Sequence, residues 1–189
     1  MAMATMVPRY TAEEVRKFPD DGLSYEVIRG ELFVSPAPGV PHQRAVADLH
    51  LMLAPYVQQH GLGEVILSPF EIEFAEDTAV QPDLLLVPPE RAHRLKEERL
   101  YGAPSLAIEI ISYSSKRTDR LQKRDLYMRE GVDEYWIVDP GLRRVERCRR
   151  SAAEPELLTN QLVWQPRLGI APLAIELGPL FEHLWRGLK

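Results

Sequence analysis

The segment VQPDLLLV occupies residues 80–87, and the segment LAIEII occupies residues 106–111. Both are short apolar runs rich in Leu, Ile or Val and flanked by Pro or Ser, the pattern of strands buried on both faces of a sheet. Each run nevertheless contains one acidic residue, Asp83 in the first and Glu109 in the second. Because an unpaired buried carboxylate costs several kcal/mol, the sequence predicts that these two acids are paired with cations or bind a metal ion.

A helix is predicted over residues 117–130, directly after the second apolar run. Asp119, Lys123 and Tyr127 follow one another at intervals of four residues, so all three lie on one face of this helix. The helix links two strands in a unit that we expect to be a right-handed parallel crossover, which brings its first half over the strand that carries Glu109. The alternative interpretation is a surface pair between Asp119 and Lys123.

Two carboxylates and a lysine can hold a divalent cation against a phosphate group. Asp83, Glu109 and Lys123 are therefore the candidate catalytic residues, and Asp119 and Tyr127 are possible supporting residues. Glu26 and His42 are further possible supporting residues, although each also has a simpler interpretation. Glu26 lies in the first arm of a predicted hairpin, where most Glu side chains face water. His42 lies in the first turn of a predicted helix, where a lone His more often caps the helix or borders the core.

The composition is that of a globular protein of one domain. The chain has 189 residues, of which 45% are hydrophobic and 27% are charged. It has no apolar run of about 18 residues, and its first residues lack a basic region followed by an apolar core, so neither a membrane span nor a signal peptide is expected. Its one cysteine, Cys148, excludes an internal disulfide and a Cys-based zinc site and favours a cytoplasmic location.

The net charge of −5 argues at first against a nucleic-acid partner. Its distribution weakens this objection, because residues 91–150 contain 15 Lys and Arg against 10 Asp and Glu. The basic excess thus falls in and after the segments that carry the acids, as expected for a protein that binds DNA. A solvated surface of mixed charge is the alternative interpretation.

The other elements follow from periodicity and turn residues. We expect a short helix after a capping box at Thr11 and Glu14, a second helix from about 42 to 60, and a C-terminal helix at 179–185. We also expect a hairpin at 25–34 and strands at 64–67, 70–74, 82–87, 105–111 and 134–138, with a loop that contains a helical turn at 88–101. An edge strand at 143–150 and two more short strands complete the prediction. The order predicts an α/β (α+β) fold in which helices flank a mixed central β-sheet, with an added N-terminal hairpin. One domain spans residues 1–189, with a core at about 24–140 and C-terminal strands and a helix at 141–189.

Pro82-Asp83, Glu109 in an apolar strand and a lysine beyond it resemble the motif of the PD-(D/E)xK nuclease superfamily, whose restriction-endonuclease-like core has the same order of elements. The chain more closely resembles the Uma family of putative restriction endonucleases. The similar stretches cover most of residues 24–140: YEVIRGEL at 25–32, His42 opening a helix, PD at 82–83, EIIS at 109–112, DRLQK at 119–123 and GVDEYWIVDP at 131–140.

The superfamily usually places its lysine two residues after the second acid, where this chain has Ile111. The resemblance therefore makes Lys123, rather than Lys116, the candidate substitute. It also implies that Asp83 and Glu109 bind Mg²⁺ (or Mn²⁺) and that Lys123 orients or deprotonates the attacking water. The two acids are expected at the ends of adjacent strands, and DNA is the implied substrate.

Three hypotheses follow: a metal-dependent endonuclease acting on DNA, a nucleic-acid-binding protein of the same fold without significant catalysis, and a structural protein whose acids only pair with basic residues. A homodimer is also expected, because two copies match the pseudo-symmetry of duplex DNA. The expected contact surface is the hairpin at 25–34 together with the apolar C-terminal residues Leu173, Ile175, Leu177, Leu180, Phe181, Leu184 and Trp185.

Overall fold

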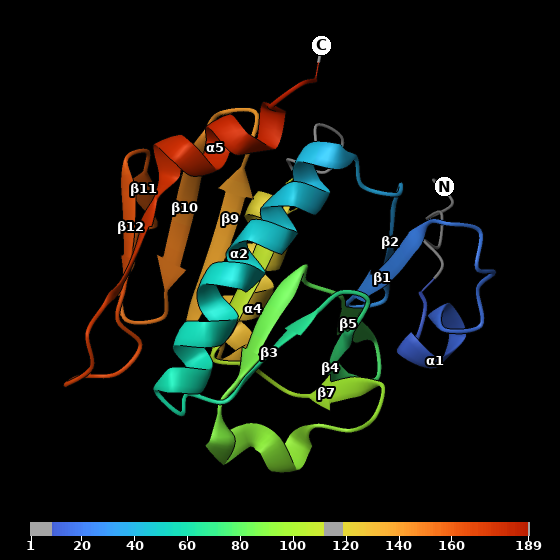
Figure 1. The fold of residues 1–189 in the computed structure, drawn as a ribbon. Helices are drawn as coiled ribbons and strands as arrows, with labels where there is room; N and C mark the ends of the chain where they lie inside the picture. Colours follow the sequence, from blue (N-terminus) through green and yellow to red (C-terminus); the bar gives the residue numbers. More distant parts are fainter. Residues whose placement is uncertain (1–8, 112–118, 189) are drawn as a thin grey trace.

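A six-stranded mixed sheet forms the centre of the molecule in the computed structural model, which describes residues 9–111 and 119–188, with only the backbone of residues 119 and 120 (Figure 1). In spatial order its strands are β11 (Glu156–Leu158), β10 (Arg144–Arg149), β9 (Glu134–Asp139), β8 (Leu106–Ile110), β6 (Leu84–Val87) and β3 (Glu64–Leu67). Strands β8 and β9 are parallel, as the predicted crossover requires, and the other neighbours are antiparallel. The predicted mixed sheet is thus confirmed.

Helices cover both faces of this sheet (Figure 1). α2 (Val40–Gln59) and α5 (Leu177–Trp185) pack on one face, while α4 (Arg124–Glu130), preceded by the π-helical turn η2 (Asp119–Lys123), packs on the other. The side chains of β6 alternate between the two cores, Leu84 and Leu86 toward α2 and Leu85 and Val87 toward α4. This burial on both faces explains why the sequence of β6 is continuously apolar.

A second sheet of five strands was not predicted. Its order is β2 (Glu31–Ser35), β1 (Ser24–Ile28), β5 (Thr78–Val80), β4 (Glu71–Ala75) and β7 (Arg99–Tyr101). The predicted hairpin at 25–34 is its β1–β2 pair, joined by Arg29 and Gly30, both with positive φ. The predictions missed β5 and β7, because each has only three residues and one lies in a segment rich in charge.

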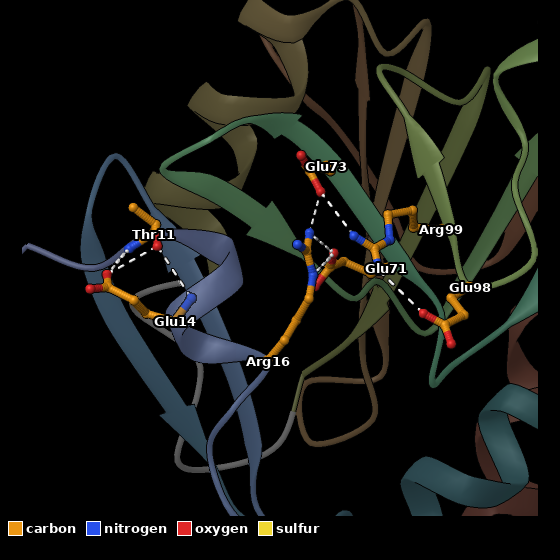
Figure 2. Close-up of polar contacts among 7 residues, drawn as sticks. All are labelled: Thr11, Glu14, Arg16, Glu71, Glu73, Glu98 and Arg99. Atoms are coloured by element: carbon orange, nitrogen blue, oxygen red, sulfur yellow. Dashed lines mark hydrogen bonds and ion pairs between the residues drawn. The ribbon is translucent and has the colours of Figure 1, made fainter.

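The predicted capping box begins α1 (Ala12–Val15), although this helix is shorter than expected. The Thr11 side chain accepts a hydrogen bond from the Glu14 N–H, and the Glu14 carboxylate accepts one from the Thr11 N–H, as Figure 2 shows. Just after the helix, Arg16 forms ion pairs with Glu71 and Glu73 on β4, and Arg99 on β7 also contacts Glu73 (Figure 2). The pairs of Arg16 fasten the segment after α1 to β4, the neighbour of the edge strand β7.

The C-terminal segment packs onto α2 and does not supply the expected contact surface. The hairpin of β12 (Gln161–Trp164) and β13 (Leu173–Glu176) precedes α5, and both Trp164 and Phe181 lie in the same core as α2. Of the seven apolar residues expected to form a dimer contact, five are at most 3% exposed: Ile175, Leu177, Leu180, Phe181 and Leu184. Val27 and Ile28 of the hairpin are also buried. The contact surface was therefore wrongly assigned, because these side chains complete the core of their own chain.

Most remaining predictions agree with the structure to within a few residues, but the strand predicted at 143–150 is not an edge strand, because β11, one of three short strands where two were expected, pairs with its outer side. One difference concerns the site, since β6 begins at Leu84 and leaves Asp83 just before the strand rather than inside it. In the part of the chain that the structure describes, no helix has the length and apolarity needed to span a membrane.

Candidate active site

A cavity of about 120 Å³ brings the predicted acids together with the predicted lysine. It is lined by residues from both sheets, from α2 and from η2. Its charged or titratable lining residues are Glu26, His42, Asp83, Glu109 and Lys123, all of which were singled out from the sequence. The site is therefore assembled from five segments that are far apart along the chain.

Asp83 and Glu109 come from neighbouring antiparallel strands. Leu84 on β6 pairs with Ile108 on β8, so the same register, continued by one residue, sets Asp83 opposite Glu109. Residues opposite each other in a sheet point to the same side, which explains why both side chains line one cavity. The Ile110 N–H donates a hydrogen bond of 2.7 Å to Oδ2 of Asp83 and fixes this carboxylate against β8.

Lys123 and Tyr127 approach Glu109 from the helix above the same sheet face. Lys123 Nζ lies 2.8 Å from Glu109 Oε1, and the Tyr127 hydroxyl donates a hydrogen bond of 3.0 Å to the same oxygen. All three side chains are buried, and burial followed by the nearby Glu109 charge raises the pKa of Tyr127 well above its ordinary value. Tyr127 is thus a neutral donor to Glu109, and the predicted helical face is correct for these two residues.

Glu26 is buried and does not face water, contrary to the simpler interpretation of its sequence position. Its Oε2 lies 2.9 Å from Lys123 Nζ, and its Oε1 accepts a hydrogen bond of 2.6 Å from the Gln81 N–H. The sequence signal for this burial is weak: Glu26 alternates with Ile28, so both face the same side of β1. No sequence signal marks the backbone amides of Gln81 and Ile110 that complete the site.

His42 contacts the other acid. Its Nε2 lies 3.1 Å from Asp83 Oδ1, and its buried Nδ1 has no hydrogen-bond partner among the described residues. His42 is placed there because Pro41 lies within the first two positions of α2, which orients the first turn of the helix over the cavity. It is therefore a neighbour of Asp83 and not an ordinary helix cap.

Two predicted residues cannot be placed beside these. The side chain of Asp119 and the whole of Lys116 lie outside the described residues. The backbone of Asp119 opens η2, four residues before Lys123.

The donor set fits a small divalent cation. Three carboxylates, those of Glu26, Asp83 and Glu109, line the cavity with one ammonium, that of Lys123, so the described lining has an excess of negative charge. Carboxylate oxygens are the ligands that Mg²⁺ and Mn²⁺ prefer. Within residues 9–111 and 119–188, no three His, Cys, Asp or Glu side chains form a ready metal cluster, so a cation held here would take its other ligands from water or the backbone.

The order of its elements and its similarity to a solved structure show that this chain has the restriction-endonuclease-like fold. The solved structure is that of a protein from Anabaena variabilis described as a "putative nuclease". The two structures have a TM-score of 0.75 and 20% sequence identity, and the match covers 93% of this chain and 99% of that one. A family model described as "Putative restriction endonuclease" matches residues 12–177, and the chain belongs to this family, Uma2. No curated protein matches the chain.

Proposed function

We propose that the protein is a nuclease that hydrolyses phosphodiester bonds of DNA with the help of Mg²⁺ or Mn²⁺. The observation that carries the proposal is the convergence of Asp83, Glu109 and Lys123 on one cavity from separate elements. Membership of the Uma2 family and the fold shared with the Anabaena protein support the same function. A carboxylate–carboxylate–lysine site suits phosphoryl chemistry, in which charge stabilisation contributes most.

Each residue has a role that its contacts support. Asp83 and Glu109 would hold the ion, with the Asp83 carboxylate oriented by the Ile110 N–H and by His42. A bound divalent ion would polarise the scissile phosphate and make an attacking water more acidic. Lys123 places an ammonium beside Glu109, where it orients that water and offsets charge on the phosphate. Tyr127 keeps the Glu109 carboxylate turned toward the cavity.

Cleavage of supercoiled plasmid DNA with Mg²⁺ or Mn²⁺ tests this function. We expect nicking that EDTA abolishes and that Asp83→Ala also abolishes, with the fold intact or slightly more stable because charge repulsion is relieved. Asp133→Ala is the matched control, since Asp133 is half-exposed, pairs with Arg91 and lies at the opposite end of the sheet. Cleavage by Asp83→Ala at the rate of the Asp133→Ala control would exclude this site.

The second candidate is a nucleic-acid-binding protein of the same fold without significant catalysis. One observation favours it: Lys123 is already paired with two carboxylates and His42 with a third, so the network is stabilised without a metal ion. DNA binding in a gel-shift assay without metal-dependent cleavage would identify this case. A chain that binds neither metal ions nor DNA would instead be the structural protein.

We also propose that the active form is a homodimer in the cytoplasm. A single metal site cuts one strand at a time, whereas two copies related by a two-fold axis can address both strands of a duplex. Five of the apolar C-terminal residues pack in the core of their own chain, which supports a contact surface outside this apolar set. Light scattering tests the assembly: a mass near 21.6 kDa at micromolar concentrations means a monomer.

A further inference from the structure

We propose that Glu26 is a positioning residue that aligns Lys123 with Glu109 and at the same time fixes the segment that carries Asp83. This inference rests on the proposed function, since it assigns a role to Glu26 in the same site. Glu26 comes from β1 in the second sheet, whereas Asp83 and Glu109 come from the central sheet or its border. It is thus the carboxylate through which the second sheet reaches the site.

The two oxygens of Glu26 have separate partners. Oε2 lies 2.9 Å from Lys123 Nζ, and the ammonium lies 2.8 Å from Glu109 on its other side. Lys123 is 4% exposed, and the side chain of Glu26 is 6% exposed. Because a lysine side chain has many rotamers, an ammonium held by one carboxylate could swing away, whereas one held between two has a defined position.

The other oxygen restrains the main chain beside Asp83. Oε1 of Glu26 accepts the Gln81 N–H at 2.6 Å, and Gln81 is separated from Asp83 by Pro82 alone. Proline fixes its own φ and restricts the residue before it to extended conformations, so the three-residue segment is stiff. A hydrogen bond at Gln81 therefore also limits where Asp83 can lie.

Glu26 thus differs from a metal ligand and from a simple structural ion pair. Each Glu26 oxygen contacts one of two separate parts of the site, whereas Asp83 and Glu109 lie opposite each other on neighbouring segments of the sheet, so we assign the ion to Asp83 and Glu109. Its two partners belong to the two parts of the site that must keep a fixed separation, Lys123 and the segment with Asp83. If these parts move apart by about 1 Å, the rate can fall about a hundredfold, even when substrate and metal still bind.

Glu26→Gln is the variant that tests the role with the least change in volume. A Gln side chain can accept only through its single oxygen, so either the Gln81 N–H or the Lys123 ammonium faces an NH₂ group. We expect kcat on plasmid DNA with Mn²⁺ to fall at least about tenfold, while KM for DNA and the Kd for Mn²⁺ change less than about threefold. Glu134→Gln is the matched control, because Glu134 is a partly buried carboxylate at the end of β9 that lies away from the site.

A double-variant cycle shows whether Glu26 acts through Lys123. We expect Glu26→Gln to slow cleavage in the wild-type background but to have little further effect in a Lys123→Met background. The double variant removes the Glu26 and Lys123 charges together but keeps the buried Glu109, so circular dichroism of all four proteins accompanies the cleavage rates. Independent effects of the two substitutions would overturn the proposal. A Mn²⁺ affinity lost in Glu26→Gln as in Asp83→Ala would also overturn it, since Glu26 would then be a ligand.

Chemical modification of Lys123 does not depend on DNA cleavage, so it tests the positioning role of Glu26 separately from the proposed nuclease function. Acetylation of Lys123 by an N-hydroxysuccinimide ester, followed by peptide mass spectrometry, reports how firmly the side chain is held. We expect acetylation to be at least about tenfold faster in Glu26→Gln than in wild type or Glu134→Gln. If the wild type cuts no DNA but shows this increase, the proposed function fails and the positioning role stands. If Glu26→Gln cuts DNA and is acetylated like the control, the positioning role is wrong and the nuclease function stands.

Discussion

The ammonium of Lys123 lies 2.8 Å from Oε1 of Glu109, although fourteen residues separate them in the sequence and they come from a helix and a strand. The position two residues after Glu109, just beyond the end of β8, is Ile111, which packs in the core on the same face of the sheet, beneath α4. A lysine on the helix above this face reaches the carboxylate that a lysine at position 111 would otherwise meet. The apolar Ile111 then adds to the core.

Removal of the Lys123 charge should destabilise the fold. Lys123→Ala would remove the ammonium that both Glu26 and Glu109 contact in the buried site, and breaking a buried ion pair in this way typically costs about 3–5 kcal/mol. Lys17→Ala is the matched control, since Lys17 forms a solvent-exposed pair with Glu13 that contributes little to stability. Urea unfolding followed by circular dichroism measures both. Equal midpoints for the two variants would mean that the pairing of Lys123 does not stabilise the chain.

The acids of the site could be predicted because each is a polar exception inside an apolar run. Asp83 and Glu109 stand out by this contrast alone, and the helical spacing of Lys123 and Tyr127 then indicates which residues face them. These are local patterns, read within single elements. The order of the core elements was predictable for the same reason.

The second sheet and the burial of Glu26 could not be predicted, because both depend on contacts between distant parts of the chain. Glu26 accepts its hydrogen bond from Gln81, which is 55 residues away, and β1 pairs with the short strand β5. Within YEVIRGEL, the alternation of Glu26 with Ile28 is only a weak indication that this Glu is buried. The environment of Glu26 is set by the pairing of β1 with β5 and by the helical turn η2, which carries Lys123 and follows much later in the chain.

His42 should matter for cleavage more than for stability. Because His42 contacts the Asp83 carboxylate at 3.1 Å, His42→Ala would let this side chain turn. Loss of such an orienting partner typically costs about 10–100-fold in activity or metal affinity. His50→Ala, on the same helix, is the control variant. Cleavage rates at fixed Mn²⁺ compare the two, and equal rates would show that His42 does not orient Asp83.

Cys148 should be unreactive in the folded protein. Burial raises the pKa of its thiol to about 11. At pH 8 roughly 0.1% of the thiol would then be thiolate, which is the form that reacts with alkylating reagents. Treatment with iodoacetamide, followed by mass measurement, should leave the native protein unlabelled and label it fully in urea. Rapid labelling without denaturant would contradict the buried position of Cys148.

Glu134 should make the folded state less stable as the pH rises through its titration range. Burial raises the pKa of its carboxyl above the ordinary value of 4.5, although the hydrogen bond from Trp136 and the charges of Arg147 and Arg149 lower it. Since the folded pKa lies above the unfolded one, the unfolded chain loses this proton first when the pH increases. The free-energy cost of ionising the buried Glu134 carboxyl therefore does not affect folding stability at pH values below its unfolded pKa. At pH values above its folded pKa, the folded protein bears this cost in full.

Glu134→Gln removes that cost and keeps an oxygen that can accept the 2.6 Å hydrogen bond from Trp136 Nε1. We expect the variant to be more stable than the wild type at pH 7 to 8, by about 1 kcal/mol or less, because the buried charge is gone. The difference should shrink as the pH falls toward 4, where the wild-type carboxyl is itself protonated in the folded state. Thermal unfolding across this pH range, monitored by tryptophan fluorescence, measures both variants. A variant that is less stable than the wild type at pH 8 and equal at pH 4 would mean that the ion pair with Arg147 outweighs the cost of burial.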